Sequence, residues 1–196
     1  MQGPSGPGRL VTLATVRFSG DIWFDFDDVE CWRFFLLLDR AAGEEGVDVD
    51  LTWLGFDPSW DGGDAPLRGG LRALAIHAAV HDRARQRTLR LALFTLRHRQ
   101  GDDFDDDVSL LAAAQVAGLD GAVMLHAIDT TGAAQLRRHR QTASSSGIVS
   151  VPTVVRDGPP LAIATTPAVE EGPARARLEV IDRMLEDDGL WRLAKP

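Results

Sequence analysis

A single cysteine, Cys31, lies among carboxylates at the start of a predicted helix. Asp28 stands three residues before it, and Glu30 directly precedes it. Because negative neighbours disfavour a thiolate, we interpret Cys31 as a small packed hydrophobe, with a reactive thiol as the alternative. Asp28 is placed to accept the free amide hydrogens of the first helical turn as an N-cap. A general base at the mouth of a cleft, aided by Glu30, is its second interpretation.

Two other groups of side chains could in principle hold a metal ion. His77 and His81 are four residues apart on a predicted helix, but no acidic residue lies between them, so the metalloprotease pattern is absent. The acidic run at 102–107 lacks the glycine and terminal glutamate of a calcium loop. One cysteine cannot build a cysteine zinc cage or an intramolecular disulfide. We therefore predict no metal site, and expect the histidines to lie on the surface or pack within a helical lobe.

The first third of the chain reads as strand, helix, strand. Strands are predicted at Leu10–Phe18 and Asp21–Phe26, separated by Ser19-Gly20, and a helix at Cys31–Ala42. The alternation of polar and apolar residues in Val47–Trp53 is typical of a strand with one buried face. A helix between two strands favours parallel pairing.

A long helical block follows a loop that is rich in glycine and proline. Helices are predicted from Leu71 to about Ser145. Breaks are expected in four places: 87–88, 100–104, 118 and 130–132. Asp106 or Asp107 is expected to cap one helix, and Asp120 the next.

The C-terminal part returns to strands. Val151–Val155 and Leu161–Ala164 form a predicted hairpin around Asp157-Gly158, and a helix is expected at Pro173–Glu186. Strands at both ends of the chain must share one sheet, so the fold is an α/β sandwich with an inserted helical lobe. We expect a flexible leader at 1–8, one domain formed by 9–56 and 147–196, and a loop with the inserted helical domain at 57–146.

Composition restricts the classes of partner. The chain has 196 residues, of which 44% are hydrophobic, and a net charge of −8. This charge repels phosphate backbones and anionic lipids, so neither nucleic acid nor membrane is an expected partner. Residues 1–8 have no features of a signal peptide, and we expect a cytoplasmic protein.

Three segments resemble a known family. The segment IWFDFDDVECW (22–32) is similar to the one in which DsbA-like thioredoxin-fold proteins place a strand and then Cys-Pro-Trp-Cys at a helix start. The segment GIVSVPT (147–153) is similar to the one that carries the family's cis proline, which faces the redox motif. DDVSLLAAAQVAGLD (106–120) resembles the helical lobe of the branch containing FrnE, 2-hydroxychromene-2-carboxylate isomerase and the kappa-class glutathione transferases. The resemblance implies a thioredoxin fold with an inserted helical lobe.

The resemblance also implies how this chain departs from the family. Asp28 stands at the position of the nucleophilic cysteine, and Cys31 at that of the resolving cysteine. Asp28 cannot attack a disulfide, so dithiol exchange within the chain is excluded under this alignment. The isomerase and transferase relatives carry a serine there and bind glutathione, whereas the carboxylate of Asp28 would repel a glutathione thiolate. The acidic and basic pair that these relatives carry after the hairpin is also missing from 163–167.

These observations lead to one expectation and two enzyme alternatives. A cis Pro152 would leave the backbone of Val151 free to pair with an extended peptide or with glutathione. We expect a peptide or small ligand to bind there without dithiol redox turnover, with Asp28, Glu30, Trp32, Val151 and Pro152 lining the groove. The alternatives are a thiol-disulfide oxidoreductase acting through Cys31, and a glutathione-dependent isomerase or transferase using Cys31 or Asp28. No cofactor other than glutathione is expected, and the sequence leaves a homodimer open.

Overall fold

The computed structural model describes residues 15–165 and 172–186. The expected leader, residues 1–8, lies outside these ranges. The strands and helices follow one another in this order: β1 Val16–Phe24, α1 Val29–Ala41, β2 Val47–Gly55, α2 Gly70–Ala79, α3 Arg83–Thr95, α4 Asp107–Val116, α5 Gly121–Ala127, α6 Ala133–Ser145, β3 Thr153–Val155, β4 Leu161–Ala162 and α7 Ala174–Glu186. Short π-helical segments, Leu96–Gln100 and Ile128–Gly132, follow α3 and α5.

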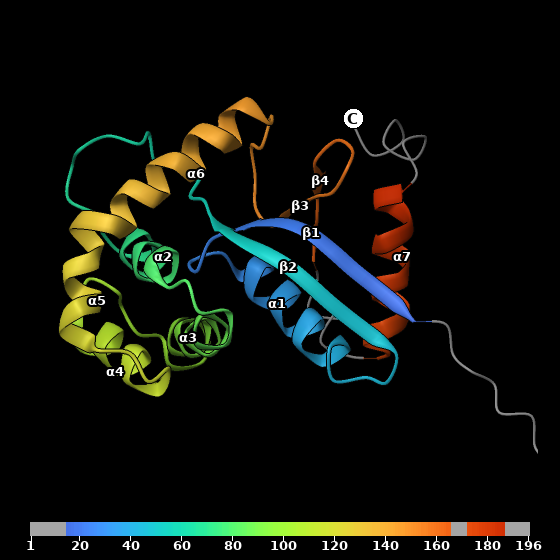
Figure 1. Ribbon diagram of the computed structural model, residues 1–196, viewed down its shortest axis with the longest axis horizontal. Helices are drawn as coiled ribbons and strands as arrows, with labels where there is room; N and C mark the ends of the chain where they lie inside the picture. The colour runs from blue at the N-terminus through green and yellow to red at the C-terminus, as the bar shows by residue number, and fades with distance from the viewer. Residues whose placement is uncertain (1–14, 166–171, 187–196) are drawn as a thin grey trace, which may run out of the picture.

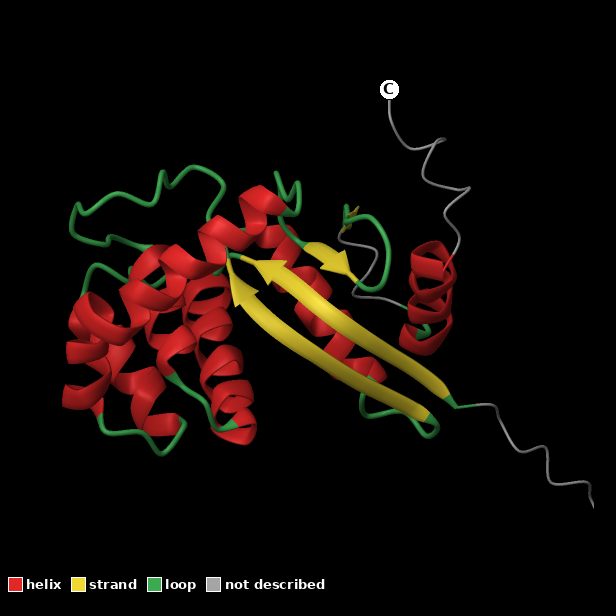
Figure 2. Cartoon of the chain, turned by 45° about the horizontal axis from the view of Figure 1, so that its top comes forward, coloured by secondary structure: helices red, strands yellow, loops and turns green. Residues whose placement is uncertain are grey.

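One sheet joins the two ends of the described chain. Its strand order is β2-β1-β3-β4, in which β1 is parallel to β2 and antiparallel to β3. Figure 2 shows β1 and β2 as two long strands whose carboxyl ends point toward the helices between β2 and β3. The parallel pairing and the shared sheet confirm the fold class expected from the sequence, an α/β thioredoxin fold with a helical insertion.

Strand β1 is continuous where the sequence suggested two strands separated by Ser19-Gly20. Gly20 lies inside the strand with φ of +140°, and a Cβ there would lie only 2.5 Å from the carbonyl oxygen of Val155. The glycine therefore permits β3 to approach β1 closely and does not mark a turn. The prediction of a break was wrong because a glycine between apolar residues can mark either a turn or a close approach of two strands, and the sequence alone does not distinguish them.

The inserted helices α2–α6 lie together beside the carboxyl ends of β1 and β2, whereas α7 packs against α1 on the other side (Figure 1). An aromatic core connects the insertion to the sheet. Phe94 of α3 lies 6.0 Å from the ring of Phe24 and 4.8 Å from that of Phe26. All three rings are fully buried. The insertion is thus packed on the sheet and not held by its connecting loops alone.

The expected helix break at 87–88 is not present, since α3 runs through it. Thr88 satisfies its hydroxyl within the helix, 3.1 Å from the carbonyl oxygen of Ala84. The chain breaks earlier, where Asp82 caps α3 by accepting the amide hydrogen of Arg85 at 2.8 Å. Other predicted helix ends are confirmed: Asp106 and Asp120 are N-caps, and Gly118 after α4 has a left-handed φ of +65°.

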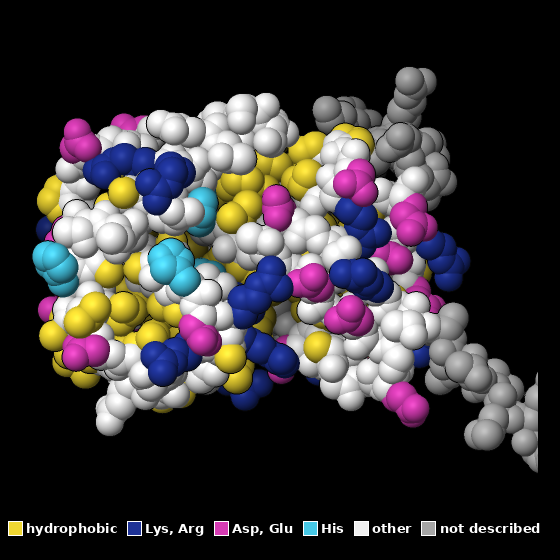
Figure 3. All heavy atoms as spheres, in the orientation of Figure 1, with side chains coloured by type: hydrophobic (Ala, Val, Ile, Leu, Met, Phe, Trp, Pro, Cys, Tyr) yellow, Lys and Arg dark blue, Asp and Glu magenta, His cyan; other side chains and the backbone are white. Residues whose placement is uncertain are grey.

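Ion pairs join the insertion to the edge of the sheet. Arg83 of α3 lies 2.7 Å from the carboxylate of Asp50 in β2, and Arg87 lies 2.8 Å from that of Asp39 in α1. Figure 3 shows basic and acidic side chains gathered side by side between the helical insertion and the strands. These pairs are largely exposed and contribute little to stability individually, but they fix where α3 sits against α1 and β2.

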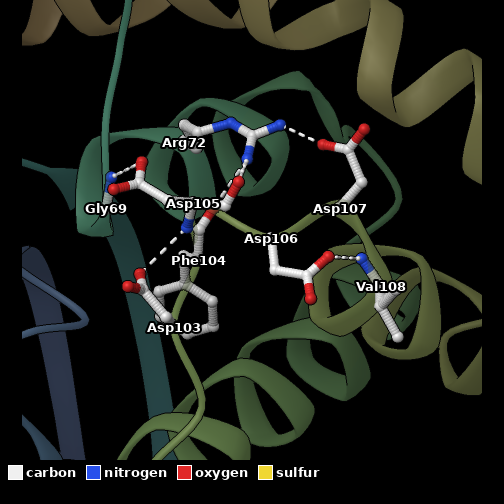
Figure 4. A network of polar contacts seen from close by, with 8 residues as sticks. All are labelled: Gly69, Arg72, Asp103, Phe104, Asp105, Asp106, Asp107 and Val108. Atoms are coloured by element: carbon white, nitrogen blue, oxygen red, sulfur yellow. Dashed lines mark hydrogen bonds and ion pairs between the residues drawn. The ribbon is translucent and has the colours of Figure 1, made fainter.

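The acidic run at 102–107 fastens the loop before α4 to the start of α2 (Figure 4). The guanidinium of Arg72 donates to the carbonyl oxygens of Phe104 and Asp105, at 2.8 and 2.7 Å, and forms an ion pair with Asp107. Asp105 in turn accepts the amide hydrogen of Gly69 at 2.9 Å. The run therefore holds a loop in place in addition to capping a helix.

Within the described ranges, no helix has the length and apolar character that crossing a membrane requires.

Candidate functional site

Helix α1 begins just beyond the carboxyl end of β1, the position at which α/β folds commonly present functional groups. Asp28 is its N-cap, as predicted: the side-chain Oδ1 accepts the amide hydrogen of Cys31 at 2.8 Å. The carboxylate is thereby directed at the free amides of the first turn and faces the positive end of the helix dipole. This contact favours the capping role over that of a free general base.

Cys31 is a core residue with only 1% of its surface exposed. Its Sγ accepts the amide hydrogen of Asp25 at 3.4 Å. Burial raises the pKa of the Cys31 thiol well above its ordinary value, and the negative charge of Asp28 raises this pKa further. The thiol is therefore neutral at physiological pH, which agrees with the interpretation of Cys31 as a packed hydrophobe.

Asp25 is an unexpected feature of the site, because it is a buried carboxyl group directly after the end of β1. Only 9% of it is exposed, and its Oδ1 accepts the amide hydrogen of Asp27 at 3.1 Å. Burial raises the pKa of Asp25 from 3.8 to about 7; the hydrogen bond from Asp27 opposes this rise, and the negative charge of Asp57 adds to it. Sequence reasoning did not single out Asp25. The available signal was an acidic residue between Phe24 and Phe26.

Asp27 and its neighbours tie the start of α1 to the insertion. Its carboxylate lies 2.7 Å from Nε of Arg97 and accepts the amide hydrogen of Gly70 at 3.0 Å. Gly70 has to be glycine or move, since a Cβ would lie 2.6 Å from the Asp27 oxygen. Nε2 of His98 lies 2.8 Å from the carbonyl oxygen of Phe26. The loop that carries Asp25 and Asp28 is thus held by two parts of the insertion, the start of α2 and the segment after α3.

Trp32 lies in the core and offers little surface to a ligand, in contrast to the groove role expected for it. It is 6% exposed and stacks on His98, with ring centroids 5.8 Å apart and planes inclined by 6°. Its ring also stacks against Phe35 at 6.0 Å, and the guanidinium of Arg99 lies 5.6 Å from it. Trp32 therefore acts as packing between α1 and the segment that follows α3.

The Val151-Pro152 peptide bond is cis. Trp23, the penultimate residue of β1, pairs with Thr153 at the start of β3. Because the strands are antiparallel, Val151 and Pro152 lie beyond this pair, at the end of the sheet where α1 begins. We call Asp28, Glu30, Val151 and Pro152 the Pro152 site.

Exposure differs among the members of the Pro152 site. Pro152 is buried, whereas Asp28, Glu30 and Val151 are half-buried. The carbonyl oxygen of Glu30 accepts a hydrogen bond from Thr165 at 3.4 Å, which joins the first turn of α1 to the segment after β4. The carbonyl oxygen of Pro152 is occupied by the amide of Ile163 at 2.8 Å. Val151 precedes the β3 ladder, so it takes no part in the pairing of β3 with β1.

The two histidines considered as metal ligands are not brought together. His77 is fully buried, and its Nε2 accepts from Arg90 at 3.2 Å, whereas His81 is exposed. Burial lowers the pKa of His77 well below its ordinary value, and the positive charge of Arg90 lowers it further. Among the described residues, no cluster of histidine, cysteine and carboxylate side chains could hold a metal ion.

Solved structures share this fold. The cytosolic disulfide reductase DsbM of Pseudomonas aeruginosa is 18% identical with a TM-score of 0.56, and the match covers 85% of this chain and 100% of DsbM. A probable DsbA oxidoreductase of Streptomyces coelicolor is also 18% identical, with a TM-score of 0.62 and coverage of 91% and 92%. DsbL of Salmonella enterica serovar Typhimurium, 13% identical, has a TM-score of 0.52 and coverage of 95% and 100%. Among curated proteins, none matches the sequence.

The sequence profile of one family covers most of the chain. The DSBA-like thioredoxin domain matches residues 21–169, a range that includes the last part of β1, the whole of α1, the insertion and the cis Pro152. The branch suggested by 106–120 is a finer assignment that this match does not reach. Together with the shared fold, the match shows that the chain belongs to the DSBA-like thioredoxin domain family, as a member with a single cysteine and hence no Cys-x-x-Cys pair.

Proposed function

We propose that this protein binds an extended peptide or a small peptide-like ligand such as glutathione at the Pro152 site, without dithiol redox turnover. The observation that carries this proposal is the state of Cys31. Its sulfur is buried and hydrogen-bonded, and its thiol pKa is raised. A thiol in this state is a poor nucleophile, so the family's ligand-binding element persists here beside an inert cysteine.

The geometry at Val151 supports strand addition. The antiparallel β1–β3 ladder begins at Thr153, so the backbone of Val151 is not part of it. The adjoining Pro152 is buried and accepts the amide hydrogen of Ile163 at 2.8 Å, which anchors this backbone beside the carboxyl end of β1. A fixed backbone segment outside the ladder can offer main-chain hydrogen bonds to a bound peptide.

Calorimetric titration with reduced glutathione, and with a short unstructured peptide, tests the proposal. We expect Cys31→Ser to bind with unchanged affinity, because the sulfur does not reach the ligand. Val151→Trp should abolish binding by covering the site. Val149→Trp is the matched control, since Val149 lies two residues away and is 81% exposed. Undiminished binding to the Val151 variant would contradict the proposal.

Thiol labelling tests the other half of the proposal. Cys31 should react with iodoacetamide only after the protein unfolds, and should form no adduct with oxidised glutathione in the native state. Rapid labelling of the folded protein at neutral pH would instead support a monothiol oxidoreductase.

Asp25 favours a second candidate, a glutathione-linked isomerase or transferase. A carboxyl group with a pKa of about 7 can both donate and accept a proton at neutral pH. The carboxyl oxygen accepts the amide hydrogen of Asp27 in the loop before α1, and the backbone amide of Asp25 donates to Sγ of Cys31 within α1. This candidate predicts an activity that Asp25→Asn removes and that Asp28→Asn leaves in place, because the carboxylate of Asp28 is engaged as a cap.

A further inference from the structure

A cavity of about 240 Å³ lies between α3, α1 and the edge strand β2, apart from the Pro152 site. We call it the α3 pocket. Its apolar walls are Phe35 and Leu38 from α1 and Val49, Leu51 and Trp53 from β2. The volume lies below the range of roughly 300–1,000 Å³ that drug-sized ligands occupy, so the space suits a small molecule.

The polar side of the α3 pocket is formed by three arginines at helical spacing. Arg83, Arg87 and Arg90 recur every three or four residues and so lie along one face of α3. The carboxylates of Asp50 and Asp39 pair with the first two, at 2.7 and 2.8 Å. Arg90 is left over, so the lining carries one more positive than negative charge.

Arg90 is a buried cation without a carboxylate partner in the part of the chain that the structure describes. It is 6% exposed, and its Nε has no hydrogen-bond partner among the described residues. Within residues 15–165 and 172–186, the hydrogen-bond partner of Arg90 is His77, a neutral acceptor, at 3.2 Å. Its guanidinium lies 3.9 Å from the Trp53 ring centroid and 5.9 Å from that of Phe35, and these cation–π contacts offset part of the lost hydration.

A buried unpaired charge is costly, and an arriving anion would compensate it. Burial lowers the pKa of Arg90 from 12.5 to about 9, the positive charge of Arg87 lowers it further, and the negative charge of Asp39 opposes this fall. The group therefore still carries its charge at neutral pH. The planar guanidinium matches a carboxylate in shape and can donate two parallel hydrogen bonds to it. The adjoining aromatic and aliphatic walls favour an anion that carries an apolar body over a bare inorganic ion.

We propose that the α3 pocket binds a small organic carboxylate, whose anionic group pairs with Arg90 and whose apolar body packs against Trp53 and Leu38. No residue that lines the α3 pocket belongs to the Pro152 site. A ligand here would bridge the insertion and the sheet, because α3 belongs to the former and β2 to the latter (Figure 1).

Calorimetric titration of the full chain with 4-phenylbutyrate tests this site, and 4-phenylbutyramide serves as the uncharged ligand of the same shape. We expect the acid to bind and the amide to bind at least about tenfold more weakly, the loss typical of one charged hydrogen bond. The indole N–H signal of Trp53, assigned by Trp53→Phe, should shift with the acid. Equal binding of acid and amide, or no binding of the acid, would overturn the proposal. Inorganic phosphate binding as tightly as the acid would overturn the role of the apolar walls.

Variants separate the arginine's charge from its packing. Arg90→Met should abolish binding while leaving the protein at least as stable, because a hydrophobic side chain replaces a buried unpaired charge. Arg140→Met is the matched control: this arginine also lies over a ring, 5.2 Å from Phe56, but it does not line the α3 pocket. Val49→Trp fills the pocket from β2 and gives an independent test if the Arg90 variant does not fold. Unchanged binding in both pocket variants would refute the assignment.

Discussion

Replacing Asp25 by asparagine should change how the stability of the protein depends on pH. The side chain is buried at the junction of β1 and α1, where burial raises its pKa from 3.8 to about 7. Folding therefore takes up a proton between these two pH values, because the native carboxyl is protonated while the unfolded one is ionised. Asparagine has nearly the same shape, keeps an oxygen for the amide hydrogen of Asp27, and does not titrate.

The sign and size of the effect follow from this rise in pKa. The stabilising contribution of the protonated carboxyl is fully present below about pH 3.8, and it is lost as the pH rises through about 7. A rise from 3.8 to about 7, at ~1.4 kcal/mol for each pKa unit, corresponds to about 4 kcal/mol. Asp25→Asn should remove this loss, so the variant should gain on the wild type by up to about 4 kcal/mol between pH 4 and pH 8.

Urea unfolding at half-unit pH intervals from 4 to 8, followed by tryptophan fluorescence, measures this difference directly. Asp21→Asn is the control, because Asp21 is an exposed carboxylate on the same strand, and its curve should parallel that of the wild type. Parallel curves for Asp25→Asn and the wild type would refute the reasoning. They would mean that Asp25 is ionised in the folded protein and that water or a cation reaches it.

Two further substitutions test local features of the fold by urea unfolding. Asp28→Ala should lower the free energy of unfolding by about 1 kcal/mol, because it removes the acceptor for the Cys31 amide. Asp28→Ser should retain most of this free energy, since serine can also cap a helix. Equal losses in the two variants would argue against capping. Gly20→Ala should lower the free energy of unfolding by roughly 1–3 kcal/mol or more, since φ is +140° and the new Cβ would meet the Val155 carbonyl oxygen. Gly101→Ala is the control and should lower it less, because Gly101 has a left-handed φ but open space around it. The reverse order would show that β3 can move away from β1.

The fold was largely predictable because its signals are local. The polar and apolar alternation of Val47–Trp53 and the caps Asp28, Asp106 and Asp120 each depend on neighbours only a few residues away. The order of strands, helical block and hairpin predicted that strands from both chain ends share one sheet, which the observed strand order confirms. Gly20 shows the limit, because its meaning depends on the distant Val155.

The site was less predictable because burial and distant contacts decide its chemistry. The local signal of Asp25, an acidic residue between Phe24 and Phe26, does not by itself reveal that the side chain is buried or that its pKa is raised. The neighbours of Trp32 are also distant in sequence, since His98 comes from the segment after α3. The pairing of Arg97 with Asp27 joins the segment after α3 to the loop before α1, and no spacing rule connects them. The sequence identified the residues of the Pro152 site by type and order, but not which of them a ligand could reach.

The order of the strands has a consequence for how the chain is synthesised. The central strand β1 is made first and gains β2 soon afterwards, but its other edge stays uncovered until β3 emerges after the entire insertion. A strand with an uncovered edge is a template for pairing with other chains. The pairing of β1 with β3 joins segments that are far apart in the sequence, so it forms late. The nascent protein therefore passes through a stage in which α2–α6 can form while the sheet is still incomplete. Aggregation during expression should depend most strongly on residues of β1 that face the later partner, such as Asp21 and Ile22.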